Sequence, residues 1–162
     1  DPGIKYYSGT ATYRSVFRVP FSVFGEAGRK TGDGTRKTEN GTRHTFVLDL
    51  GSVHKIARVA LNGEDFGVVW TPPFRVDVTG RLRPGDNELE IVVANTWVNR
   101  LIGDQQPGNK DVRQLRWESG MLGGRPHPAG RYTFTTAKDY TADSALQPAG
   151  LLGPVSVRAI RR

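Results

Sequence analysis

Apolar residues recur at every second position in many segments of the chain, and this period most constrains the fold. Successive side chains of a β-strand point to opposite faces, so such a segment can bury one face against a core. A clear example is the expected strand Asn87–Asn95, where Leu89, Ile91 and Val93 alternate with polar or smaller residues. The same pattern predicts strands at Thr10–Val19, Arg43–Leu50, Lys55–Leu61, Glu64–Trp70, Phe74–Val78, Arg131–Thr136 and Val155–Ile160.

The inward-facing positions of these strands define the expected core. They are Phe17, Phe46, Leu48, Val59, Leu61, Val76, Leu89, Ile91 and Val93. In the segment Glu64–Trp70 the same period aligns Phe66, Val68 and Trp70 on one face.

Turn signals separate the expected strands, and no stretch combines a helical period with helix caps. Asn62-Gly63 is a strong hairpin signal, because both residues tolerate positive φ. Pro84 presets φ for a second turn, and Gly85 supplies the reversal. About eight short strands with turns between them predict an all-β fold with negligible helix, an antiparallel β-sandwich or jelly roll.

Two segments interrupt the alternation. Gly25–Gly41 is rich in glycine and polar residues and is expected to form a surface loop. Its Asp33 and Glu39 could bind Ca²⁺ with loop carbonyls, although a polar surface loop without metal is the preferred interpretation, and we expect no cofactor. Thr96–Gly130 is long and irregular but contains apolar residues, which indicates a packed loop.

A chain of 162 residues fits one domain, so we expect a single β-sandwich domain over residues 1–162. The absence of Cys excludes disulfides, thiolate catalysis and Cys-based zinc sites. The first residues, Asp1-Pro2-Gly3, have no feature of a signal peptide, and we expect the chain to be a segment of a longer protein. No run of about 18 apolar residues exists, so no membrane span is expected.

The chain is basic, with a net charge of +7 and an isoelectric point near 10.0. Basic residues are spread evenly, which favours an ordinary solvated surface. An acidic polysaccharide is a sharper interpretation of the same charge. Nucleic acid is not expected as a partner, because no nucleic-acid-binding motif is present.

The residues required for catalysis are poorly represented. There is no G-x-S-x-G sequence, and no two His residues have metal-ligand spacing. A glycosidase needs two carboxyl groups on rigid supports, and the only acids near aromatic residues in the long loop are Asp104 and Glu118. Pairing them would be arbitrary, so we expect no catalytic residue.

Sugar binding has a physical signature, because aromatic faces stack on the apolar faces of pyranose rings and planar polar groups bond the hydroxyls. For each Trp considered alone, core packing is the default expectation. Polar and aromatic groups concentrate, however, where the strand ending at Asn95 meets the long loop. The candidate carbohydrate-binding residues are Trp97, Asn99, Arg100, Asp104 and Trp117.

A second interpretation of the same segment is structural. Arg100 and Asp104 could pair with each other and hold the loop in place, with Trp97 packed beneath it, because polar groups in a folded loop must be satisfied internally.

Several motifs resemble a known class of domain. The segments 7–14, 60–63, 73–79 and 84–89 resemble the sugar-binding β-sandwich found beside the barrel in family 2 glycoside hydrolases. The segments Asn95–Asp104 and Pro148–Val155 are narrower, and they resemble the C-terminal sandwich of the large α-L-rhamnosidases of glycoside hydrolase family 106.

The resemblance implies a galactose-binding-like jelly roll from the C-terminal part of a secreted or periplasmic enzyme that degrades rhamnose-containing plant or algal polysaccharide, possibly an acidic one. Catalytic carboxylates of such enzymes lie in the barrel, which this chain lacks. We therefore expect a non-catalytic carbohydrate-binding accessory module whose partners are that polysaccharide and the catalytic domain, with no membrane or nucleic acid. The alternative is a structural domain that packs on the barrel and binds no sugar by itself.

Overall fold

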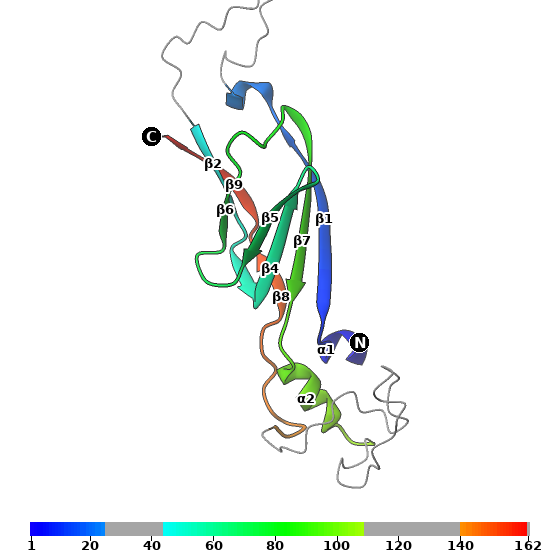
Figure 1. Cartoon of the computed structure of the whole chain (residues 1–162). Helices are drawn as coiled ribbons and strands as arrows, with labels where there is room; N and C mark the ends of the chain where they lie inside the picture. Colours follow the sequence, from blue (N-terminus) through cyan, green and yellow to red (C-terminus); the bar gives the residue numbers. More distant parts are fainter. Residues whose placement is uncertain (25–43, 109–139, 162) are drawn as a thin grey trace, which may run out of the picture. The chain divides into compact units, whose positions relative to one another are not determined.

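The computed structural model describes residues 1–24, 44–108 and 140–161, which form two compact units (Figure 1). One unit combines residues 1–9 with residues 95–148, and the other combines residues 10–94 with residues 149–162. The second unit holds the described β-strands, and the first holds the segment in which a binding site was predicted.

The strands of the second unit form antiparallel sheets, as the alternation predicted. A four-stranded sheet has the order β1 (Thr10–Val19), β7 (Gly85–Ala94), β4 (Ile56–Leu61) and β5 (Glu64–Val69). A three-stranded sheet has the order β6 (Arg75–Asp77), β2 (His44–Asp49) and β9 (Ser156–Arg161). The short strands β3 (Ser52–His54) and β8 (Gly150–Gly153), which the alternation did not predict, pair separately.

The hydrophobic core contains side chains from both larger sheets. Leu48 of β2 and Val76 of β6 belong to the same cluster as Val59 of β4 and Ile91 of β7. All but one of the predicted core residues are buried, and the exception, Phe17, is partly buried against the cluster. The strand orders give a mostly β, antiparallel architecture but do not by themselves give a jelly roll.

The hairpin between β4 and β5 turns at Asn62-Gly63, as predicted. Their φ angles are 53° and 81°, and the flanking residues Leu61 and Glu64 are paired across the two-residue loop. Positive φ at both central residues matches the right-handed twist of the strands.

The prediction that Phe66, Val68 and Trp70 share one face is wrong. Between the pairs Arg58–Val68 and Ala60–Asp65, β5 has one residue more than β4, and Gly67 has a φ of 80°. Such a β-bulge changes which face the later residues occupy. Phe66 and Val69 therefore contact the core, whereas Val68 and Trp70 are exposed.

A buried polar residue organises the other turn at this end of the sheet. Asn87 is fully buried, and its amide nitrogen donates to the carbonyl oxygens of Arg83 and Gly85. Its amide oxygen accepts hydrogen bonds from the Arg83 N–H and from the side chain of Asn62. Both ends of the amide are satisfied, as burial requires.

Short helices are present, contrary to the expectation of an irregular segment after Asn95. α2 spans Val98–Asp104, α1 spans Pro2–Lys5, and a 3₁₀ turn η1 spans Phe21–Phe24. In the described part of the chain, no helix is long and apolar enough to cross a membrane. The predicted strand Arg131–Thr136 lies outside the described residues.

Candidate functional site

The segment predicted to bind sugar is organised by α2. The helix begins after Trp97, whose carbonyl oxygen accepts the Leu101 N–H at 2.8 Å. Asn99, Ile102 and Asp104 are buried. Two of the three polar residues predicted for the site on this helix therefore point into the unit.

Asn99 is fully engaged in the fold of its own unit. Its amide nitrogen donates to the carbonyl oxygen of Gln147 at 2.8 Å, and its amide oxygen accepts the Gln147 N–H at 2.8 Å. This reciprocal pair ties α2 to a segment 48 residues further along the chain. One donor and the acceptor oxygen of the Asn99 amide are therefore used to hold the fold.

Arg100 and Asp104 form an ion pair one helical turn apart. The guanidinium Nη2 and Nε lie 3.1 and 3.2 Å from Asp104 Oδ1. The Asp104 side chain is fully buried, and that of Arg100 is 18% exposed. A buried carboxylate requires such a partner, because desolvation without one is costly. The pair that the structural interpretation requires is therefore present.

Trp97 differs from these polar residues because 54% of its surface is exposed. Core packing, the default expectation for each Trp, is therefore wrong for Trp97, and it is also wrong for Trp70, which is 70% exposed. Exposure also contradicts the idea that Trp97 is packed beneath the loop. Trp117, the fifth predicted site residue, lies outside the described residues.

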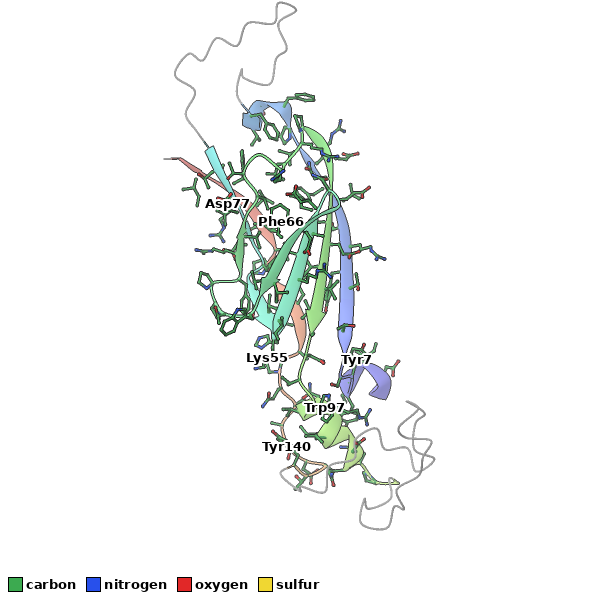
Figure 2. The ribbon with its side chains drawn as sticks, in the orientation of Figure 1. Tyr7, Lys55, Phe66, Asp77, Trp97 and Tyr140 are labelled. Atoms are coloured by element: carbon green, nitrogen blue, oxygen red, sulfur yellow. The ribbon has the colours of Figure 1, made fainter. Side chains whose placement is uncertain are left out.

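A second exposed aromatic residue, Tyr7, lies in the same unit and was not predicted as part of the site. It is 45% exposed. The side-chain amide of Asn95 donates to the Tyr7 carbonyl oxygen at 2.9 Å and accepts the Gly9 N–H at 2.8 Å. Figure 2 shows Tyr7 and Trp97 in the same region, near the beginning of α2. No sequence pattern indicates this approach, because Asn95 and Tyr7 are 88 positions apart.

The N-terminal segment packs closely on α2 through a glycine. A Cβ atom at Gly103 would lie 2.7 Å from Cβ and Cγ of Tyr6. Tyr6 itself is buried. Any larger residue at position 103 would therefore separate the helix from the segment that carries Tyr7.

The clearest pKa shifts occur away from this segment, in the sheets. The Gly51 N–H and the Arg75 guanidinium hold the pKa of Asp49 below its ordinary value of 3.8. The Arg58 side chain and the Gly67 N–H likewise lower the pKa of Asp65. Such carboxylates remain ionised and are poor proton donors at neutral pH.

The described residues contain no group of three or more His, Asp or Glu side chains that could hold a metal ion. Asp33 and Glu39, predicted as a possible Ca²⁺ site, lie outside the described residues, as does Glu118. The described part of the site therefore offers two exposed aromatic rings and polar groups that are largely engaged in internal bonds.

The chain resembles parts of larger glycoside hydrolases. The structure of a rhamnosidase from Novosphingobium sp. PP1Y is 41% identical, with a TM-score of 0.66, and the similarity covers 97% of this chain and 11% of that chain. A protein named "Putative beta-glucuronidase" from Formosa agariphila is 38% identical over 99% of this chain and 13% of its own length. No protein-family model matches the chain.

A weaker similarity relates the chain to a β-glucuronidase from an uncultured Clostridium sp., which is 26% identical with a TM-score of 0.43. That similarity covers 59% of this chain and 14% of the other. The chain spans only 11% of the rhamnosidase and 13% of the Formosa agariphila protein, as expected for an accessory domain.

Proposed function

We propose that the chain is a non-catalytic accessory module of a rhamnosidase-like glycoside hydrolase and that it binds carbohydrate. The observation that carries the proposal is the exposure of Trp97 at the start of a helix whose Asn99 and Asp104 side chains are buried. Exposed aromatic rings are the groups that stack on pyranose faces. The similarity to a small part of a rhamnosidase supports the enzyme class.

The proposal includes a setting and partners. The module would act in a secreted or periplasmic enzyme, beside a catalytic barrel, on rhamnose-containing plant or algal polysaccharide. The net charge of +7 favours an acidic polysaccharide. The two larger antiparallel sheets contribute to one core, which supports a galactose-binding-like jelly roll as the finer description of the fold.

A specific observation favours a second candidate, a structural domain that packs on the barrel and binds no sugar alone. Asn99 and Asp104 are buried, and both bond within the chain. Three of the residues predicted to bond a sugar, counting Arg100, thus have structural partners.

A binding screen separates the two candidates. The purified chain is titrated with rhamnose, galacturonate oligomers, rhamnogalacturonan and ulvan-type polysaccharide by isothermal titration calorimetry. Saturable binding that persists at about 0.5 M NaCl is expected, because salt at that concentration screens nonspecific attraction between exposed charges. Absence of binding to every one of these probes would leave the structural domain as the function.

A further inference from the structure

Two exposed aromatic residues of the first unit come from the two sequence segments that form it. Tyr7 lies just before the first sheet strand, and Trp97 lies just before α2. Both remain about half exposed, although Tyr6 beside the first is buried. Two polar residues of the same unit, Asn99 and Asp104, are buried, so the exposure of these two aromatic rings needs an explanation.

Asn95 holds the backbone of the Tyr7 segment beside the Trp97 segment. Its side-chain amide bonds the Tyr7 carbonyl oxygen and the Gly9 N–H, and its own N–H donates to the Gly9 carbonyl oxygen at 3.1 Å. These three hydrogen bonds hold Tyr7 and Gly9 against Asn95, which precedes Trp97 by two residues in the sequence. Figure 2 shows Tyr7 and Trp97 in the same region.

Gly9 leaves room for the Tyr7 ring. A Cβ atom at position 9 would lie 2.7 Å from the phenolic oxygen of Tyr7 and 3.0 Å from its Cζ. The phenol ring of Tyr7 therefore lies against Gly9, whose N–H donates to the side chain of Asn95. The φ of Gly9 is 148°, which also disfavours a side chain there.

The base of Trp97 is held equally firmly. Its carbonyl oxygen accepts the first α2 hydrogen bond, and the helix is anchored by the Asn99–Gln147 pair and by the Arg100–Asp104 pair. These polar groups hold the helix, and the exposed rings of Tyr7 and Trp97 are groups of the described residues on which a ligand could stack.

We propose that Tyr7 and Trp97 together form the stacking platform for a pyranose ring of a glycan, with Asn95 and Gly9 as positioning residues. This inference rests on the proposed carbohydrate-binding function and assigns its site. A backbone that is held in place before binding loses little freedom when a sugar stacks on its side chains, which favours affinity. Arg100 serves the fold, because its guanidinium pairs with Asp104.

Substitutions of exposed residues test the platform in the whole chain. Tyr7→Ala, Trp97→Ala and the control Trp70→Ala are titrated with rhamnogalacturonan oligosaccharides at about 0.5 M NaCl, where nonspecific charge attraction is screened. Trp70 is the matched control because it is an exposed Trp of the other unit. We expect at least about fivefold weaker binding for the first two and no change for the control, because each of the first two substitutions removes a face on which the pyranose stacks.

A double-substitution cycle tests the positioning. Gly9→Ala should weaken binding in the wild-type chain but should cause no further loss in a Tyr7→Ala background, because it acts through the ring. Tyr7→Phe keeps the ring and should keep most of the affinity. Thermal melting of each variant shows that the chain remains folded.

The outcomes are distinct. Binding by the wild-type chain that Tyr7→Ala and Trp97→Ala leave unchanged overturns the platform, while the proposed function stands with its site elsewhere. Absence of binding by the wild-type chain overturns both. A loss confined to Trp70→Ala also overturns the platform and places the site in the other unit.

Discussion

The ion pair between Arg100 and Asp104 shows how a residue that suggests binding can serve the fold. Asp104 is fully buried, and the guanidinium of Arg100 lies 3.1 Å from its carboxylate. By contrast, the pair between Arg14 and Glu90 at 2.6 Å lies on the surface. Surface pairs contribute little, whereas a buried carboxylate that loses its partner is costly.

We therefore predict that Arg100→Ala lowers the free energy of unfolding by about 1–3 kcal/mol, the cost of leaving a buried polar group unsatisfied. Arg14→Ala, the control, should cost less than about 1 kcal/mol. Urea denaturation measures both. Equal losses in the two variants would show that the Arg100–Asp104 pair does not hold the helix.

Asp49 links stability to pH. Hydrogen bonds from the Gly51 N–H and from Arg75 lower the pKa of its carboxyl group in the folded chain. A carboxyl group whose pKa is lower in the folded chain than in the unfolded chain stabilises the fold at pH values above its unfolded-state pKa. This stabilisation is lost as the pH falls through the folded-state pKa.

The stability difference between wild type and Asp49→Asn should therefore be largest near neutral pH and shrink as the pH falls below the ordinary value of 3.8. Urea midpoints measured across that range check this. Asp86→Asn is the control, because Asp86 is exposed and its contact with Arg18 is 4.0 Å long. A difference that is independent of pH would contradict the account.

At the scale of elements, the alternation of apolar residues predicted most of the described strands, and all but one of the core residues that it named are buried. It could not predict the bulge in β5, because Phe66, Val68 and Trp70 continue the period that the extra residue interrupts. It also missed α2, since a helix of seven residues is too short to display a helical period.

The partners of the site residues were equally out of reach, because Asn95 and Asn99 bond residues that are 88 and 48 positions away. The sequence did indicate the segment itself, through the concentration of polar and aromatic residues after β7. The exposure of Trp97 depends on packing that no local pattern records.

The central strand β7 should dominate the stability of its unit. Ile91 is buried between β1 and β4, where it faces Tyr13 and Val59 across the two strand pairs. Ile91→Ala should cost roughly 2–5 kcal/mol, the usual range for a large buried residue. Val16→Ala on the exposed face of β1 should cost less than about 0.5 kcal/mol. Chemical denaturation distinguishes them, and a similar small loss for both would mean that the register is wrong.

The bulge makes its own prediction. Gly67 has a φ of 80°, and its N–H donates to Asp65 Oδ1 at 3.0 Å. Gly67→Ala should cost about 1–2 kcal/mol, because a Cβ is disfavoured in the left-handed region. Gly67→Asn should cost less, since Asn tolerates that region better. Equal stability of both variants and wild type, measured by thermal melting, would show that the bulge imposes no such constraint.

At the scale of the whole molecule, the chain is similar to a part that makes up 11% of a rhamnosidase. Carboxylates of the described residues are repeatedly paired with arginines, as in Asp49 with Arg75 and Asp65 with Arg58. The pKa values of these two carboxyl groups are lowered, whereas a glycosidase acid needs a raised one.

We therefore predict that the purified chain does not hydrolyse aryl rhamnosides or other simple glycosides. Retaining and inverting glycosidases both need two carboxyl groups that flank the scissile bond, one of them protonated. Of the two acids suggested by the sequence, Asp104 is buried against Arg100, so it is inaccessible to a glycosidic oxygen. Release of p-nitrophenol from the aryl glycoside measures turnover, and the wild-type chain should match a buffer blank. Turnover that survives purification and disappears in Asp104→Asn or Glu118→Gln would mean that the module carries its own active site.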